Sequence, residues 1–219
     1  MATIVTSAPR ASQARSRKTR QLILSAAVRV LIASGIEGFT MLAVSQSAGV
    51  SVGSIYRRFG GKEQLLAAAQ QEFISNFGEQ LVEKLSRFDE NAAPDPFERV
   101  GHAVAALVST FRDNGAAMRV LLLLGVQDSG IYEQGSIASV DGGRDYALFL
   151  APLSTEIVHE DPLRAIDFTY RIVYASCAHR LTQGEFLESE LPLDWPALSD
   201  GLAASMAAYL LNAPGKKLT

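Results

Sequence analysis

The chain has 219 residues, of which 48% are hydrophobic and 20% are charged, a composition typical of soluble globular proteins. Its single cysteine, Cys177, excludes a disulfide framework and any zinc site built on several thiolates. The most apolar run, Val120–Leu124, is far shorter than the ~20 residues of a membrane span, and no signal-peptide pattern opens the chain. We therefore expect a soluble, cytoplasmic protein without a membrane partner.

The net charge of −3 conceals a strong asymmetry along the chain. Residues 1–62 hold nine basic side chains and one acidic side chain, Glu37, which gives this segment a charge of +8. The remaining residues hold 11 basic and 22 acidic side chains, a charge of −11. Such a distribution is typical of a small polyanion-binding head joined to a body that does not bind nucleic acid.

The first residues predict a tail followed by a helix. Residues 1–15 are rich in Ser, Ala and Thr, and we expect them to be disordered. Residues 17–34 carry pairs of apolar residues at every fourth position, which is the pattern of a helix with one buried face. Gly35 is a stop signal for that helix.

Two short helices joined by a tight turn are predicted next. Thr40 can cap a helix over 41–48, and Ser51 can cap a second helix over 52–59. Gly49 stands where the chain must turn sharply, so we expect it to have a positive φ. Together with the preceding amphipathic helix, this arrangement predicts a helix-turn-helix.

After Gly60-Gly61 a long helix is predicted over 62–87, and the remaining patterns are also helical. The other expected helices cover 97–113, 116–127, a less regular 131–159, 163–182 and 195–211, with breaks at Gly115, Gly130, Gly142-Gly143, Pro162, Gly184 and Pro192. No alternation typical of strands occurs, so the predicted fold is all-α. We expect a disordered basic tail (1–15), a helix-turn-helix domain (16–62), a helical ligand-binding and dimerisation domain (63–214) and a second tail (215–219).

The segment from Phe39 to Leu66 resembles the DNA-binding signature of the TetR family of bacterial repressors. The resemblance rests on Ala-Gly-Val-Ser at 48–51, Ile-Tyr-x-x-Phe at 55–59 and Lys-Glu-x-Leu-Leu at 62–66. It covers residues 17–75 closely, whereas the rest of the chain matches only in helical content and length.

The resemblance implies a role for each matching residue. Thr40 and Tyr56 correspond to side chains whose hydroxyls contact phosphate, and Lys62 opens a helix whose N-terminal amides can address phosphate with it. Arginines of the second helix can bind phosphate or read guanine. The predicted DNA-binding residues are Thr40, Ser51, Val52, Gly53, Ser54, Tyr56, Arg57, Arg58 and Lys62.

Three residues depart from the family pattern. Leu42 stands where members often carry a polar or basic residue, and Ser45 replaces a usual alanine. Val52 is apolar, so it can touch a thymine methyl but cannot hydrogen-bond to a base. Direct reading of bases is therefore expected to be sparse, which gives more weight to Arg57, the N-terminal arm or the shape of the DNA.

Catalytic patterns in the body are incomplete. Glu156-x-x-His159 has the spacing of half a di-iron site, and the second Glu-x-x-His that such a site needs does not occur. Cys177 and His179 are two residues apart on one helix, so their side chains point in different directions. We therefore predict that the chain is not an enzyme and holds no metal or cofactor.

A pocket between the helices of the body is the better hypothesis, because apolar and aromatic residues are frequent there. The expected occupant is a small, largely apolar or aromatic molecule. Each polar candidate in the pocket could instead be a satisfied structural residue. The candidate ligand-binding residues are His102, Arg119, Tyr146, Phe149, Arg171, Tyr174 and His179.

The last two helices are expected to form a homodimer interface, as a four-helix packing of two helices from each chain. The alternative is that their apolar stripes face the chain's own core. The stripes comprise Trp195, Leu198, Leu202, Met206, Tyr209, Leu210 and four small residues, Ala203, Ala204, Ala207 and Ala208, with Ile166, Tyr170, Val173, Ala175 and Cys177 on the preceding helix.

The sequence thus predicts a DNA-binding transcriptional regulator. Its expected mode of action is that of a repressor, released from a palindromic operator in double-stranded DNA when a small-molecule inducer binds. The alternative is a nucleoid-associated or partner-controlled DNA-binding factor without an inducer. A helical enzyme with an incidental basic head is a third possibility.

Overall fold

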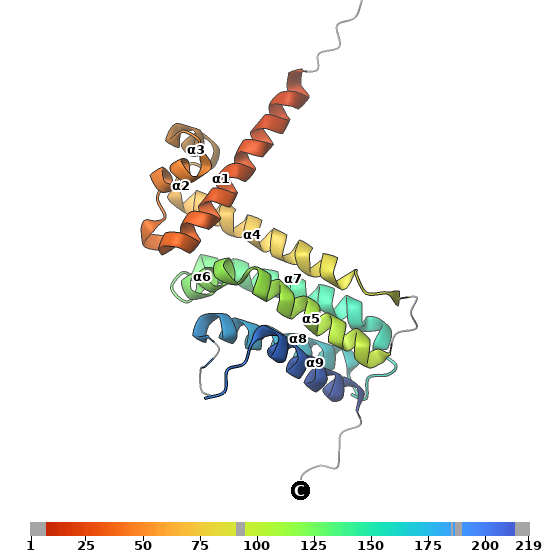
Figure 1. Ribbon diagram of the computed structural model, residues 1–219. Helices are drawn as coiled ribbons and strands as arrows, with labels where there is room; N and C mark the ends of the chain where they lie inside the picture. Colours follow the sequence, from red (N-terminus) through yellow and green to blue (C-terminus); the bar gives the residue numbers. More distant parts are fainter. Residues whose placement is uncertain (1–7, 91–94, 185, 187–189, 213–219) are drawn as a thin grey trace, which may run out of the picture. The chain divides into compact units, whose positions relative to one another are not determined.

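The computed structural model describes residues 8–90, 95–184, 186 and 190–212, and within this part of the chain every regular element is a helix (Figure 1). The predicted all-α fold is therefore confirmed. The chain divides into two compact units, Met1–Phe73 and Ile74–Thr219, which we call the head and the body. The expected tail at 215–219 and the first half of the expected tail at 1–15 fall outside the described residues.

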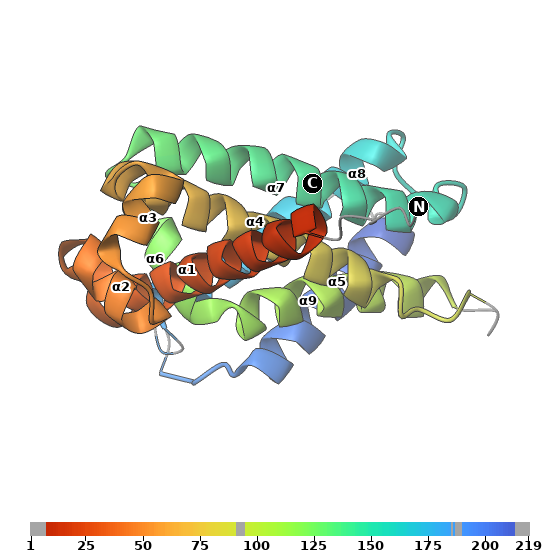
Figure 2. The same cartoon turned by 90° about the horizontal axis from the view of Figure 1, so that it is seen from above.

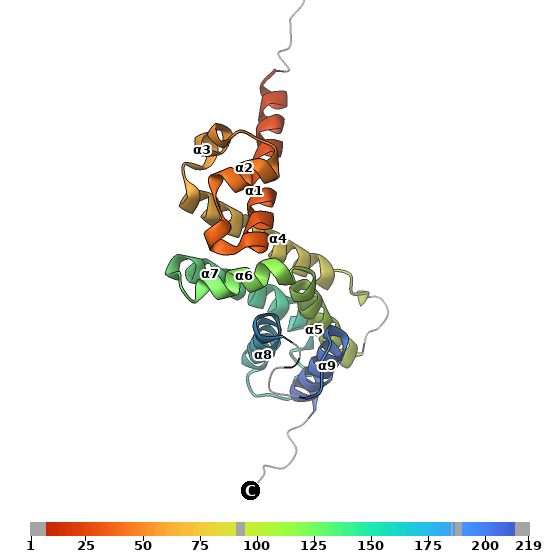
Figure 3. The same cartoon turned by 60° about the vertical axis from the view of Figure 1, so that its left-hand side comes forward.

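The head consists of α1 (Ala8–Gly38), α2 (Met41–Ala48), α3 (Val52–Phe59) and the first half of α4 (Lys62–Leu85). Helices α2 and α3 lie beside α1 (Figures 1 and 3). The core of the head is fully buried and apolar, because α1, α2, α3 and α4 each contribute at least one large side chain to it. These side chains are Ile23, Leu24, Phe39, Val44, Ile55 and Leu65.

Helix α1 is longer than the sequence pattern predicts. It begins at Ala8 and not near Arg17. Residues 8–20 contain mainly Ala, Arg, Gln and Ser with no breaker after Pro9, and proline is well tolerated in the first turn of a helix. The predicted stop is found at Gly35, where φ is 63° and ψ is −168°, so helical geometry is interrupted there.

One helix in the described residues, Gln13–Gly38 within α1, is long and apolar enough to span a membrane by length and composition alone. Polar residues interrupt the apolar ones throughout this stretch, so no continuous apolar run marks it in the sequence. The apolar side chains Ile23, Leu24, Ala27 and Leu31 are at most 4% exposed, since they fill the core of the head. A core helix of a soluble protein meets the same two criteria.

The body contains the end of α4, then α5 (Pro96–Asp113), α6 (Gly115–Gly125), α7 (Ser129–Leu150), a short 3-10 turn η2 (Ala151–Leu153), α8 (Pro162–Gln183) and α9 (Trp195–Leu211). Helix α5 packs against α9 and α8, and α7 packs against α6 and α8. Seen from above, α7 lies on one side of the body, and α5 and α9 lie on the other (Figure 2).

Aspartates begin four of these helices. The side chains of Asp95, Asp128, Asp161 and Asp194 each accept a hydrogen bond from a backbone N–H of the first turn. They satisfy amides that have no partner within the helix and place a negative charge at the positive end of the helix dipole. Sequence patterns could therefore locate these starts to within one or two residues.

Two predictions about α7 are wrong. The expected break at Gly142-Gly143 lies inside the helix, because the two glycines leave room for the ring of Tyr170 on α8. A Cβ atom at Gly142 would lie 2.9 Å from the Tyr170 Oη, and one at Gly143 would lie 3.1 Å from Cε1. The helix ends at Leu150 and does not reach His159, because Pro152 cannot donate to a helical hydrogen bond.

Seven of the fifteen residues of the expected dimer stripes are buried within the chain itself. Ile166, Tyr170, Val173 and Cys177 of α8 are at most 5% exposed in a single chain, so they cannot form an outward surface. Met206, Ala207 and Leu210 of α9 are at most 8% exposed and face the core next to α5. The stripe residues that remain at least partly exposed are Trp195, Leu198, Leu202, Ala203, Ala204, Ala208, Tyr209 and Ala175.

Candidate nucleic-acid interface

The turn between α2 and α3 is closed by one glycine and one serine. Gly49 has φ 66° and ψ 32°, the left-handed conformation that was predicted for it. The Val50 amide donates to the Ser45 carbonyl at 3.2 Å, and the Ser45 Oγ donates to the Val50 carbonyl at 2.5 Å. Ser45 thus has a structural role in fixing the angle between the two helices, and its departure from the usual alanine gave no hint of this bond.

Two hydroxyls cap the helices that flank this turn, as predicted. The Thr40 Oγ1 accepts a hydrogen bond from the Ala43 amide at 3.1 Å, and the Ser51 Oγ accepts one from the Ser54 amide at 3.3 Å. Both residues are exposed. Because each hydroxyl is an acceptor in its cap, its own proton remains available to donate to an external acceptor such as phosphate.

Helix α3 is anchored by one residue and presents the others outwards. Ile55 is fully buried, whereas Gly53, Tyr56 and Arg57 are exposed, with Tyr56 at 51%. Nothing lies within 4 Å of where a Cβ of Gly53 would be, so the helix surface is open at this point. Helices of this size fit the major groove of B-DNA, where an open surface lets the backbone approach the bases.

The two arginines of α3 have different surroundings. Arg58 is half-buried, and its Nη1 donates to the Ser54 carbonyl at 3.1 Å and to the Ser54 Oγ at 2.5 Å. Arg57 is exposed and makes no hydrogen bond or ion pair with the described residues. Residue type and spacing predicted that both bind phosphate or guanine. In the structure, Arg58 is hydrogen-bonded to Ser54, whereas the Arg57 guanidinium remains available.

Lys62 lies at the first turn of α4, half-buried, and its Nζ donates to the Ile36 carbonyl at 3.2 Å. Gly60 precedes it with φ 90°, which turns the chain from α3 into α4. The ammonium therefore links α4 to the end of α1 and keeps two further protons for other acceptors. This carbonyl partner was not predicted, because it lies 26 residues away in the chain.

Two basic residues of α1 hold the head together. Arg29 donates to the Ser47 carbonyl at 3.2 Å and so joins α1 to α2. Arg20 lies 3.7 Å from the Glu72 carboxylate, and its guanidinium lies 5.8 Å from the centre of the Phe59 ring. These contacts were not found from the sequence, because positive charge alone does not distinguish an internal partner from an external one.

The predicted ligand-binding residues fall into separate groups. Tyr146 and Tyr174 belong to one aromatic cluster, in which Tyr170 lies 5.7 Å from the first ring and 5.9 Å from the second. His102 and Phe149 belong to another, with ring centres 5.6 Å apart. Three candidates are at least partly exposed in the single chain and join neither cluster: Arg119, Arg171 and His179.

The first cluster has a hydroxyl without a hydrogen-bond partner of good geometry among the described residues. Tyr146 is fully buried, and its Oη makes no such bond. Burial raises the pKa of Tyr146 to about 12, opposed by the Thr169 hydroxyl. The Tyr170 hydroxyl donates to the Ser139 carbonyl at 2.9 Å. The surroundings of this first cluster are thus aromatic, with hydroxyl groups as the polar atoms.

The second cluster surrounds a buried arginine that sequence reasoning missed. Arg99 is 5% exposed, donates to the Phe149 carbonyl at 2.8 Å and pairs with the Glu90 carboxylate at 2.7 Å. Its guanidinium also lies 4.9 Å from the Phe88 ring and 5.0 Å from the Phe149 ring. His102 donates through Nε2 to the Lys84 carbonyl at 2.9 Å, so it too has a structural partner.

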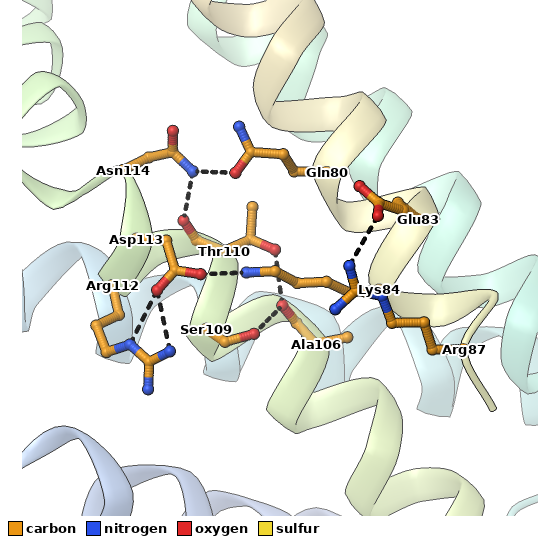
Figure 4. Close-up of polar contacts among 10 residues, drawn as sticks. All are labelled: Gln80, Glu83, Lys84, Arg87, Ala106, Ser109, Thr110, Arg112, Asp113 and Asn114. Atoms are coloured by element: carbon orange, nitrogen blue, oxygen red, sulfur yellow. Dashed lines mark hydrogen bonds and ion pairs between the residues drawn. The ribbon is translucent and has the colours of Figure 1, made fainter.

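A polar network joins the end of α4 to the end of α5 (Figure 4). Lys84 pairs with Asp113 at 2.7 Å, and the Asn114 side chain donates to the Gln80 Oε1 at 2.8 Å. The hydrogen bond from Lys84 lowers the pKa of Asp113, and partial burial of the carboxyl opposes that shift. The network fixes the two helix ends against each other.

His159 and Cys177, the residues considered for a metal site and for catalysis, also have structural roles. His159 donates through Nε2 to the Tyr209 carbonyl at 2.6 Å and stacks on the Tyr209 ring. Cys177 is buried, which raises the pKa of its thiol to about 12. Among the described residues, no three His, Cys, Asp or Glu side chains lie close enough together to hold a metal ion.

A family model described as "Bacterial regulatory proteins, tetR family" matches residues 23–69. The chain is 37% identical over 59 residues to an uncharacterized HTH-type transcriptional regulator, TtgW, of Pseudomonas putida, which is 27% of this chain and 44% of that protein. It is 26% identical over 130 residues to the HTH-type transcriptional regulator BetI of Stenotrophomonas maltophilia, which is 59% of this chain and 63% of that protein. These matches therefore span less than two thirds of either relative.

Solved structures resemble the fold over most of its length. A candidate TetR-family transcriptional regulator from Mesorhizobium loti has a TM-score of 0.73 at 16% identity, over 89% of this chain and 96% of that one. The fatty acid degradation regulator FadR from Bacillus halodurans has a TM-score of 0.62 at 17% identity, over 87% and 98%.

The head is therefore a helix-turn-helix domain of the DNA-binding class. With its two caps, its left-handed glycine turn and the matching family model over residues 23–69, this domain is similar to the DNA-binding domain of the TetR family of bacterial regulatory proteins.

Proposed function

We propose that the chain is a homodimeric transcriptional repressor that binds a palindromic operator through its two heads. The observation that supports this most strongly is the outward face of α3. Gly53, Tyr56 and Arg57 lie exposed on a helix whose start and end are fixed by Ser51 and Gly60. A rigidly held helix with an open, basic outer face is the element that enters a major groove.

The contacts divide into positioning and reading. Thr40, Ser51, Tyr56 and Lys62 reach phosphate with hydroxyl or ammonium protons and set the register of the head on the duplex. Arg57 reads a base, because its guanidinium has no internal partner and can bind guanine through two hydrogen bonds. Val52, Gly53, Ser54 and Arg58 line the same interface, and Arg58 acts mainly by holding Ser54 in place.

The dimer forms through the parts of α8 and α9 that remain exposed. Small residues on α9, including Ala204 and Ala208, allow two helices to approach closely, and Leu198, Leu202 and Tyr209 supply apolar surface beside them. A twofold dimer presents two copies of α3, so its half-sites lie about one helical turn or a multiple of it apart. Such a regulator acts in the bacterial cytoplasm, where the chromosome lies.

A small, largely apolar or aromatic inducer binds within the body. It favours a dimer state in which the distance between the two heads does not match the half-sites of the operator. The aromatic interior around Tyr146 and Tyr174, the Phe149 cluster with His102, and the polar side chains of Arg119, Arg171 and His179 are the places where contacts are expected. To release DNA, the inducer must bind the non-binding state more tightly, and a coupling of about 1–3 kcal/mol gives a change of roughly 5–150-fold. The alternative is a factor controlled by a protein partner.

The test starts with selection of duplex DNA from a randomised library by the full-length protein. Each base position of the selected site is then compared for the wild type, Arg57→Ala and Arg58→Ala at fixed salt. We expect Arg57→Ala to weaken binding to the selected site by about 1–3 kcal/mol and to reduce the base preference at one position in each half-site. Arg58→Ala should leave that position's preference in place. Retention of every base preference by both variants would show that neither arginine reads a base.

A further inference from the structure

The N-terminal end of α1 is a helix without a core. Among the α1 side chains that the structure describes, Ile23 is the first that is buried in the head. The fifteen residues Ala8–Leu22 therefore extend the helix by about 22 Å beyond the part that fills the core, and within this stretch Arg20 and Gln21 contact Glu72 of α4. In Figures 1 and 3 this end projects beyond α2 and α3. An isolated helix of this length is only marginally stable in water, so its helical form needs support from elsewhere.

The exposed part of this extension is strongly basic. Arg15, Arg17 and Lys18 are exposed and make no ion pair with any described residue. The first acidic residue of the chain is Glu37. Arg15 and Lys18 are three residues apart, as are Arg17 and Arg20. Like charges at this spacing repel each other on a helix. A polyanion laid along the helix would remove this repulsion.

One face of the extension continues the face by which α1 packs into the head. Leu31, Ala27, Leu24, Arg20, Arg17 and Gln13 follow one another at steps of three and four residues, which places them on one side of the helix. The stripe is apolar from Leu31 to Leu24, and Arg20 points to Phe59 of α3 and Glu72 of α4. Arg17 and Gln13 thus lie on the α3 side of the helix, one and two turns beyond the last internal contact.

Building on the proposed DNA binding by α3, we propose that the α1 extension is a second DNA-binding element, which lies along the duplex next to the half-site that α3 contacts. Arg17 and Gln13 face the sugar-phosphate backbone there, and Arg15 and Lys18 point away from it. The extension of about 22 Å is as long as about six phosphate spacings on one strand. DNA is favoured over a lipid surface, because residues 8–21 contain no Leu, Phe or Trp to insert between lipids.

The test uses the full-length protein and a duplex selected from a randomised library by the wild type. The variants are Arg17→Gln and, as a matched control on the opposite side of the helix, Arg15→Gln. Both remove one charge from an exposed site and keep a good helix former. Affinity is measured between about 50 and 200 mM salt, first with flanking DNA and then with a duplex that lacks about six base pairs outside each half-site.

With flanking DNA, Arg17→Gln should lower the slope of log affinity against log salt by about 0.9 for each head. Arg15→Gln should change it by less than half as much. Removing the flanks should weaken the wild type and Arg15→Gln alike, whereas Arg17→Gln should lose little further affinity. Equal slopes for the two variants, or an equal loss on removing the flanks for all three proteins, would overturn the proposal.

Two further outcomes separate this inference from the proposed function. If the wild type selects no duplex and shows no salt-dependent binding, the proposed function fails together with the inference. If the wild type binds a duplex, but the α1 charges affect only its binding to phosphatidylserine vesicles, the inference alone fails and the extension is a membrane-surface element. Circular dichroism of each variant checks that the helix content is unchanged.

Discussion

Replacing Gly49 by alanine tests whether the left-handed turn organises the head. At this position φ is 66°, and a Cβ atom would meet nothing within 4 Å, so backbone strain is the only cost of the substitution in the folded state. An L-residue in this conformation costs about 1–2 kcal/mol, and alanine returns about 0.4–1 kcal/mol by restricting the unfolded chain. We expect Gly49→Ala to destabilise the head by about 1 kcal/mol.

Gly53→Ala is the matched control, because Gly53 also has open space around its Cβ position but lies within the helix α3. Alanine is favoured over glycine in a helix, so this variant should be about 0.5–1 kcal/mol more stable. Hydrogen exchange of peptides from residues 41–59, followed by mass spectrometry, reports the opening of the head itself. The populations of the open state of the two variants should therefore differ by about 10–30-fold. A Gly49→Ala protein with wild-type protection would refute the turn argument.

Three predictions concern the body. Gly142→Ala should destabilise it by about 1–2 kcal/mol by displacing the Tyr170 hydroxyl from the Ser139 carbonyl. The same Gly142→Ala substitution should cost less in a Tyr170→Phe protein, as a double-mutant cycle in urea would measure. Cys177 should react with a thiol reagent only after unfolding, since its thiol is buried and its pKa is raised to about 12; rapid labelling of the native protein would contradict this. Stability should fall as pH rises from about 9 to 12, because unfolded Cys177 and Tyr146 lose their protons before the folded groups do, and Cys177→Ala should reduce that slope.

Local chemistry made the head predictable. Thr40 and Ser51 cap helices through bonds to residues three positions away, and Gly49 supplies a conformation that other residues rarely adopt. Such signals act within one turn of helix, so they can be read from a short stretch of sequence. Helices α2 and α3 accordingly begin and end at the predicted residues.

The body was harder to predict, because its decisive contacts join residues far apart in the chain. Gly142 looks like a helix breaker until the ring of Tyr170, 28 residues later, is placed against it. Arginine is usually a surface residue, but Arg99 is buried, and the carbonyl that it binds belongs to Phe149, 50 residues away in the chain. Helical periodicity alone could not decide whether Tyr170 and Val173 face a partner or the chain's own core, and the structure buries both.

The basic side chains of the head show why a charge count overestimates DNA contacts. In the described part of the head, one set has internal partners, through an ion pair for Arg20 and through hydrogen bonds for Arg29, Arg58 and Lys62. A second set makes no hydrogen bond or ion pair through its side chains: Arg15, Arg17, Lys18 and Arg57. If only the two cations proposed to reach phosphate, Arg17 and Lys62, neutralised phosphates, the salt slope would be about −1.8 for each head, whereas all eight would give about −7. A slope near the larger value, measured for the full-length protein on its selected duplex, would mean that DNA breaks the internal contacts. In that case binding should also loosen α1 from α2, because Arg29 would have to leave the Ser47 carbonyl to reach phosphate. Hydrogen exchange in α2 would then rise on DNA binding, whereas the smaller slope predicts that it falls.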